Sequence, residues 1–197
     1  MDLQLIVKRC QAGEKDAFEE LLKSVEKKAF ATAYFICGNK EIAQDILQET
    51  YLKCFVNINS LKKAEYFNTW FFKILIRTSW KMQKKNSKVI PMEITSENEE
   101  LLYNIDSNRK NEIDNFHIQY MLQSAIDKLT PSLKTVIVLY YYNDMTTEEI
   151  AKITGSLNAT VRSRLYYARH ALKKQLSDCS DTVIRISNNR EAYAHER

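Results

Sequence analysis

The sequence predicts an all-α protein of two small helical domains joined by a flexible acidic linker, with a helix-turn-helix in the second domain. Only 3 Gly and 2 Pro occur in 197 residues, which favours helices over a turn-rich β fold. Apolar residues recur at spacings of three and four along most of the chain. The predicted parts are an N-terminal domain (1–86), an acidic linker (87–112), a C-terminal domain (113–177) and a polar, frayed tail (178–197).

The N-terminal domain is expected to be helical throughout. A short first helix ends at Gly13, and a long amphipathic helix is predicted from Asp16 to residue 37. The next helix, from about residue 40 to 58, buries one side and presents a polar, acidic side. Because such a face is usually solvated, its composition alone gives it no role.

A helix over residues 66–85 closes this domain and carries a cationic stripe. Lys73, Arg77 and Lys81 recur every four residues, with Trp80 among them. A cationic stripe beside an aromatic ring suits a phosphate backbone and unstacked bases. A solvated lysine face with a half-buried tryptophan is the alternative, and this helix alone does not separate the two.

The linker is defined by its charge and its lack of periodicity. Pro91 disfavours a helix, and acids outnumber bases over residues 87–112. We therefore expect a tether between two units, each with its own basic face.

The centre of the C-terminal domain has clear helix start and stop signals. Thr130 is the predicted cap of one helix, and Pro131 stands at its first helical position. Thr146 and Glu149 form a capping box at the start of the next, and Gly155 ends it. Two short helices around a Gly-containing turn predict a helix-turn-helix.

The helix after this turn, with Asn158 as its predicted cap, is apolar on one side and basic on the other. Arg162, Arg164 and Arg169 lie off its apolar face, and no acid occurs between residues 159 and 176. A helix of this kind at the second position of the motif is suited to the DNA major groove. A basic surface helix in an ordinary bundle is the alternative.

Other features limit the function classes. Four cysteines lie far apart without a CxxC pair, which predicts free thiols in a reducing cytoplasm. The histidines have no metal-ligand spacing, and we expect no metal, no cofactor and no catalytic residue. The N-terminus turns polar too early for a signal peptide, and the longest apolar run, residues 136–142, is too short to insert into a membrane.

Four stretches in this order resemble the extracytoplasmic-function (ECF) group of bacterial sigma factors. They are DAFEELLKSV, EIAQDILQETYLKCF, FNTWFFKILIR and TTEEIAKITGSLNATVRSRLYYAR, and the resemblance covers roughly residues 14–176. It implies a promoter-specificity subunit that directs RNA polymerase core enzyme to promoter DNA and begins melting, with no reaction of its own. Residues 1–86 would then be sigma region 2, and residues 113–177 sigma region 4.

The resemblance assigns roles to three sets of residues. Docking on the β′ clamp helices of the core is assigned to Ala43, Asp45, Ile46, Gln48, Glu49 and Thr50. Recognition and melting of the −10 element, including capture of a flipped base, is assigned to Leu61, Lys62, Lys63, Tyr66, Phe67, Trp70, Phe71, Lys73, Arg77, Trp80 and Lys81. Reading of the −35 duplex is assigned to Asn158, Thr160, Arg162, Ser163, Arg164, Tyr166, Tyr167 and Arg169.

The sequence departs from the family pattern at three positions. Arg77 and Lys81 stand where the family often has Asn and Asp, and Tyr167 stands where it often has a basic residue. The resemblance further implies contact with the β flap, a cytoplasmic location and stress-response control by a membrane-anchored anti-sigma factor.

Two other functions stay open from the residues alone. A stand-alone helix-turn-helix regulator would share the C-terminal domain but would need neither the acidic docking face nor the aromatic-basic helix. An enzyme acting on nucleic acid would need clustered carboxylates or a positioned base. Asp45 and Glu49 are one turn apart, but no histidine or further acid joins them.

Overall fold

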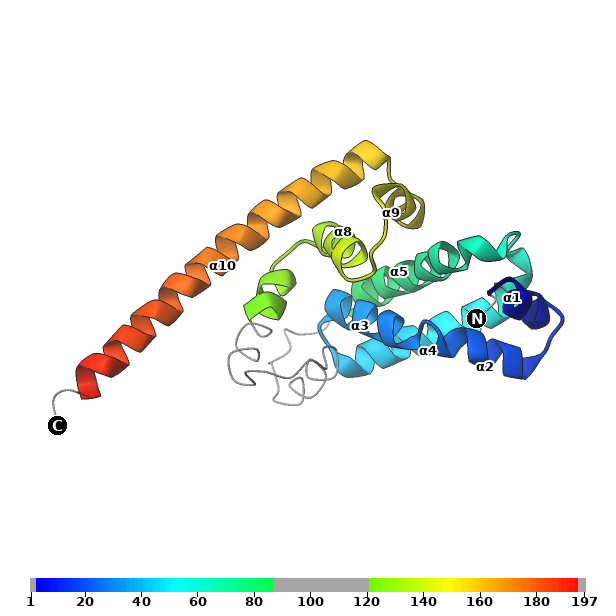
Figure 1. Ribbon diagram of the computed structural model, residues 1–197, viewed down its shortest axis with the longest axis horizontal. Coiled ribbons are helices and arrows are strands. Elements are labelled where there is room, and N and C mark those ends of the chain that lie inside the picture. Colours follow the sequence, from blue (N-terminus) through cyan, green and yellow to red (C-terminus); the bar gives the residue numbers. More distant parts are fainter. Residues whose placement is uncertain (1–2, 87–120, 195–197) are drawn as a thin grey trace.

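The computed structural model describes the backbone of residues 3–86 and 121–194, and side chains over residues 3–84 and 121–176. Over these ranges the protein is helical, which confirms the all-α prediction (Figure 1). The elements are α1 (Leu3–Gln11), α2 (Lys15–Lys23), α3 (Glu26–Cys37), α4 (Lys40–Asn57), η1 (Ile58–Ser60), η2 (Ala64–Tyr66), α5 (Phe67–Asn86), α8 (Pro131–Tyr141), α9 (Thr147–Thr154) and α10 (Asn158–Ala194). The predicted acidic linker lies outside the described residues.

Helix α5 is the element around which the N-terminal half packs. It lies against α3 and α4, and Phe67, Phe71 and Leu75 on its inner side are fully buried. The Phe71 ring centroid is 5.8 Å from that of Phe67 and 5.5 Å from that of Phe72. Large aromatic rings bury the most apolar area per residue, so this cluster contributes much of the core between α5 and the helices packed on it.

The prediction of one continuous helix from Asp16 to residue 37 is wrong, because the chain forms two helices there, α2 and α3. The Ser24 hydroxyl donates to the Leu21 carbonyl at 2.6 Å, and the Val25 N–H bonds Leu22 in a tighter turn. A serine that bonds back to its own helix competes with regular helical bonding. The apolar spacing continues across the break, which is why periodicity did not reveal it.

The start and stop signals of α8 and α9 are confirmed with one exception. Thr146 and Glu149 form the capping box in both directions, and Gly155 ends α9 in the left-handed conformation with a φ of 65°. Pro131 is the first residue of α8, but the Thr130 side chain makes no capping hydrogen bond. The local chemistry of the helix-turn-helix therefore follows the sequence closely.

Helix α10 differs from the prediction at both ends. Asn158 is its first helical residue instead of the residue before the helix, and the helix continues to Ala194 where a frayed tail was expected. The segment contains neither Gly nor Pro, so nothing in its sequence enforces a stop after Leu176. In Figure 1 the C-terminal end of α10 extends away from the other helices.

The two halves of the chain pack against each other. Helix α9 contacts α5, and α8 contacts α3, so one apolar core runs through both halves (Figure 1). Val136, Leu139 and Ile150 of the C-terminal half are completely buried. The independent units expected from the sequence are therefore in direct contact in this structure.

Candidate functional site

The outward side of α4 is polar over its first half. Asp45 and Gln48 are exposed, as the predicted docking face requires. Glu49 is half-buried, and its carboxylate lies 3.0 Å from the Lys53 ammonium one turn later. Lys53 also donates to the Thr78 hydroxyl of α5 at 3.0 Å, so Glu49 is partly engaged within its own domain.

Three members of the predicted docking set lie on the opposite side of α4. Ala43, Ile46 and Thr50 are completely buried, and the Thr50 hydroxyl donates to the Ile46 carbonyl at 2.7 Å. These side chains hold α4 against its own core, so a partner would not touch them. The docking prediction stays a prediction, and the structure narrows it to the exposed members.

The second half of α4 exposes an apolar strip that sequence reasoning missed. Leu52, Phe55 and Val56 are 65%, 53% and 76% exposed. The Phe55 ring meets the Phe18 ring of α2 edge-on, with centroids 5.2 Å apart. The strip follows the polar residues at helical spacing, which is the signal that could have found it. We define the α4 face as Asp45, Gln48, Leu52, Phe55 and Val56.

The loop between α4 and α5, where base capture is predicted, is held by hydrogen bonds from α1. The Gln11 side-chain amide of α1 donates to the carbonyl of Ile58 at 3.2 Å and to that of Leu61 at 2.9 Å. Leu61 itself is buried. Because both carbonyls are held by one side chain, the loop is presented in a defined shape.

The outer side of this loop is cationic and aromatic. Lys62, Lys63 and Tyr66 are all exposed, as their predicted DNA role requires. The Tyr66 ring lies 5.9 Å from the Lys63 ammonium and 5.6 Å from the Lys152 ammonium of α9. Tyr66 is therefore the exposed ring of this loop, with the Lys152 ammonium of α9 beside it in this arrangement.

Two aromatic residues of the predicted −10 set are part of the core. Phe67 and Phe71 are 1% and 0% exposed, so their direct contact with a DNA strand is not available in this structure. Trp70 is half-buried, and its ring centroid is 6.3 Å from that of Phe67. Phe67 and Phe71 pack beneath the predicted −10 surface, while the half-buried Trp70 can form part of that surface.

The cationic stripe of α5 reaches solvent only in part. Arg77 and Lys81 are exposed, and Lys73 is half-buried. Trp80 is also half-buried, and its indole N–H donates to the Thr135 hydroxyl of α8 at 3.1 Å. Trp80 is thus engaged with the C-terminal half and not free to meet a base in this arrangement.

The first turns of α10 present four exposed residues on one side. Arg162, Ser163, Tyr166 and Tyr167 point away from the apolar face, which buries Val161, Leu165 and Ala168. The Tyr166 and Tyr167 rings meet edge-on with centroids 5.5 Å apart. We define the α10 face as Arg162, Ser163, Tyr166 and Tyr167, and its exposure agrees with a role in base contact.

Glu148 of α9 stands at the edge of the α10 face. Its carboxylate accepts a hydrogen bond from the Asn158 amide at 2.5 Å and lies 4.0 Å from the Arg162 guanidinium. Hydrogen bonds from its own backbone N–H, then from Asn158, keep the pKa of Glu148 below its ordinary value, with a smaller contribution from Arg162. Sequence reasoning did not single out Glu148.

The remaining residues of the predicted −35 set are divided between support and surface. Thr160 is half-buried, and the Arg164 guanidinium donates to the Ser156 hydroxyl in the turn at 2.9 Å. The Arg169 guanidinium lies 5.4 Å from the Tyr140 ring and 5.5 Å from the Tyr141 ring. Arg169 is therefore directed toward α8, away from the first turns of α10.

The described side chains offer no metal centre and no activated thiol. Within residues 3–84 and 121–176, no three His, Cys, Asp or Glu side chains come together as metal ligands. Cys10 and Cys54 are buried and free, and burial raises the pKa of Cys54 to about 12. Burial also raises the pKa of Cys37 to about 11. High thiol pKa values disfavour the reactive thiolate.

Over residues 3–86 and 121–194, every helix is too short or too polar to span a lipid bilayer.

Two sequence families match the two halves of the chain. The family described as sigma-70 region 2 matches residues 18–89, and the family described as sigma-70, region 4 matches residues 119–172. The first match includes the α4 face and α5, and the second includes the helix-turn-helix. The order of the two matches is the order of the surfaces described above.

Individual proteins match over most of the chain. The RNA polymerase sigma factor SigV of Bacillus subtilis is 32% identical over 75% of this chain and 84% of its own. The ECF RNA polymerase sigma factor SigW of the same organism is 28% identical over 87% and 95%. Among solved structures, CnrH in complex with the cytosolic domain of CnrY aligns with a TM-score of 0.68 at 17% identity, over 90% of this chain and 99% of that one. RpoE of Bartonella quintana, solved with the anti-sigma factor NepR, aligns with a TM-score of 0.66 at 22% identity, over 83% and 98%.

Proposed function

The chain belongs to the ECF group of bacterial RNA polymerase sigma factors, and we propose that it docks on core enzyme through the α4 face. As an alternative sigma factor, it directs core polymerase to promoters. The observation that carries the docking proposal is the apolar strip of Leu52, Phe55 and Val56, which continues the polar residues Asp45 and Gln48. Exposed aromatic and aliphatic side chains in one line are typical of a protein interface and are unusual on a solvated helix.

The proposed division of promoter recognition follows the two halves. Tyr66 and the exposed lysines beside it would receive a base of the −10 element, and Arg77 and Lys81 would hold strand phosphates. The α10 face would enter the major groove of the −35 element, where Arg162 can bond a guanine through both of its terminal nitrogens. We divide the chain at residues 86 and 113, as the sequence suggested.

The partners and location are part of the same proposal. The β′ clamp helices would receive the α4 face, and the β flap would contact the C-terminal half. CnrH and RpoE were solved with protein partners, that of RpoE being an anti-sigma factor, and this supports an anti-sigma factor for this chain. We further propose that this factor is anchored in the membrane and acts in a stress response. We infer a cytoplasmic protein without a reaction or cofactor of its own.

The experiment is run-off transcription by purified bacterial core polymerase on a promoter library, with and without this protein. We expect transcripts that require the protein and arise from templates sharing two spaced motifs. Core binding is measured in parallel by co-purification. If core neither binds the protein nor starts transcription with it, the proposal fails in favour of a stand-alone regulator.

A further inference from the structure

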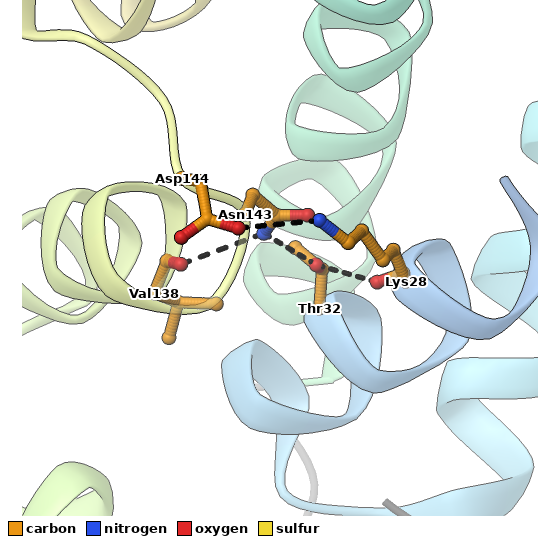
Figure 2. A network of polar contacts seen from close by, with 5 residues as sticks. All are labelled: Lys28, Thr32, Val138, Asn143 and Asp144. Atoms are coloured by element: carbon orange, nitrogen blue, oxygen red, sulfur yellow. Dashed lines mark hydrogen bonds and ion pairs between the residues drawn. The ribbon is translucent and has the colours of Figure 1, made fainter.

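A buried hydrogen bond joins the two halves of the chain. The Asn143 side-chain amide, in the turn after α8, donates to the Thr32 hydroxyl of α3 at 2.8 Å (Figure 2). Thr32 is completely buried and Asn143 is 8% exposed. The Thr32 hydroxyl also donates to the Lys28 carbonyl at 2.7 Å. This hydroxyl therefore donates within the N-terminal half and accepts from the C-terminal half. Such a bond is satisfied only while the halves are in contact.

The next residue, Asp144, adds a second link at the same place. Its carboxylate lies 3.4 Å from the Lys28 ammonium of α3 (Figure 2). Asp144 has a φ of 56°, a left-handed conformation that Asp and Asn adopt more readily than other non-glycine residues. The turn that carries Asn143 and Asp144 is thus shaped to present both side chains to α3.

Further contacts lie on the DNA-facing side of the N-terminal half. Trp80 of α5 donates to Thr135 of α8, and Lys152 of α9 lies 5.6 Å from the Tyr66 ring. Both aromatic residues belong to the set expected to meet the −10 strand. A strand that stacks on Tyr66 would have to displace Lys152.

The geometry of a promoter requires the halves to separate. Elements named for positions 10 and 35 upstream are about 25 base pairs apart, which is about 85 Å at roughly 3.4 Å per base pair. In this structure α9, beside the −35 reader, packs directly on α5. Residues 87–120, at up to about 3.5 Å per residue, can span about 120 Å and therefore permit separation.

We propose that the contact is an intramolecular latch, in which the surface of α3 and α5 binds α8 and α9 and must release them before both promoter elements are engaged. The inference rests on the proposed function for its consequence, although closure itself can be measured without polymerase. The closed form occupies Tyr66 and Trp80, and it leaves the α4 face and the α10 face exposed. Core enzyme can therefore meet the closed form and then open it.

The contact has the features of a reversible one. The Asn143 side-chain oxygen is buried without a hydrogen-bond partner. An open surface groove of about 430 Å³ lies at the seam, lined by Trp80, Gln83 and Lys84 of α5 and by Pro131 and Ser132 of α8. The unpaired oxygen and the partly open seam both make closure less favourable than a fully paired and fully packed contact would be.

The test is Thr32→Val in the full chain, measured by small-angle X-ray scattering and by acrylamide quenching of Trp80. Valine has the shape of threonine, so α3 keeps its packing while the buried Asn143 amide loses the Thr32 hydroxyl and keeps only its longer bond to the Val138 carbonyl, at 3.4 Å. We expect the closed-to-open ratio to fall about tenfold, because the Asn143 N–H that Thr32 accepted is then buried without a partner, which is costly only in the closed form. The radius of gyration and the Trp80 quenching should both rise, and Trp80→Phe identifies the Trp80 signal.

Two further variants make the test specific. Thr154→Val removes a hydroxyl with the same kind of bond, 2.8 Å to the Ile150 carbonyl inside α9, and should leave closure unchanged. Thr32→Val combined with Asn143→Leu replaces both partners with apolar groups and should restore compactness. If Thr32→Val and Thr154→Val give the same dimensions and quenching as the wild-type chain, the latch is refuted.

Transcription separates this inference from the proposed function. With a latch, Thr32→Val reaches half-maximal run-off at up to about tenfold lower protein concentration and an unchanged maximum, because the competent form is more populated. If the wild-type chain directs initiation and Thr32→Val has the same dose dependence, only the latch fails. If no chain directs initiation, the proposed function fails while the scattering result still decides closure.

Discussion

The α4 face and the α10 face are both exposed sides of amphipathic helices, yet they differ in charge and in apolar area. The α4 face has an acidic and amide end followed by Leu52, Phe55 and Val56. The α10 face has Arg162 at its start, exposed tyrosines after it, and no acid among residues 159–176. Both helices rest on buried cores, so the difference lies in the kind of partner surface that each face can bind.

The difference teaches how protein docking and DNA reading can be told apart on one chain. An apolar strip gains free energy only when a partner removes it from water, which a close-packed protein surface does well. A cationic face with hydroxyl groups gains from phosphates and base edges, and its binding weakens steeply with salt. The two faces should therefore respond differently to the same perturbations.

The largest expected effect is on the α4 face. Leu52→Ala combined with Phe55→Ala should weaken binding to core polymerase about 100-fold or more, because exposed aromatic and aliphatic anchors carry most of an interface's free energy. Calorimetry or competition binding measures it. Leu5→Ala, which removes another exposed leucine from α1, is the matched control and should bind normally. Equal affinity for the double variant and the wild type would remove the α4 face from docking.

The next effect is on the α10 face. Arg162→Ala should cost about 1–3 kcal/mol of discrimination at one base pair of the −35 element. Binding to duplexes mutated one position at a time measures it. Arg164→Ala is the comparison, since Arg164 bonds Ser156 in the turn and should lower affinity without changing sequence preference. If Arg162→Ala weakens every duplex equally, the residue contacts only phosphate.

The smallest effect concerns Glu148, which borders the α10 face. Its pKa is lower in the folded chain than its ordinary value of 4.5, so its charge stabilises the fold above that pH and this contribution disappears as pH falls through the folded-state pKa. Glu148→Gln keeps an acceptor for Asn158 and removes the charge. Its melting temperature should be slightly below that of the wild type at pH 7 and equal to it at strongly acidic pH. A difference that persists unchanged at acidic pH would contradict this account.

The sequence predicts the local features of the C-terminal half well, for a physical reason. Thr146, Glu149 and Gly155 act through bonds within a few residues, so their pattern is sufficient to locate α9. Ser24 shows the opposite case. Its hydroxyl bends the chain between α2 and α3, while the apolar spacing on both sides reads as one helix.

The sequence predicts the outer faces less well, because burial depends on which side of a helix meets the core. Helix α4 has apolar residues on both sides. Periodicity predicts that Ile46 is buried, which the structure confirms, but it does not say that Leu52 lies outside. Phe71 lies on the side of α5 that periodicity predicts to be apolar, and only the resemblance placed it among the residues that meet DNA. The Thr32–Asn143 bond joins residues 111 positions apart, and no local pattern predicts such a pair.

The most direct test of the separation between the two faces is a crossed binding experiment. Leu52→Ala/Phe55→Ala and Arg162→Ala are each measured against core polymerase and against a −35 duplex taken from the transcription library. The account predicts that the first variant loses core binding and keeps duplex affinity, while the second keeps core binding and loses duplex discrimination. Loss of both activities in either folded variant, or loss of neither in both, would contradict it.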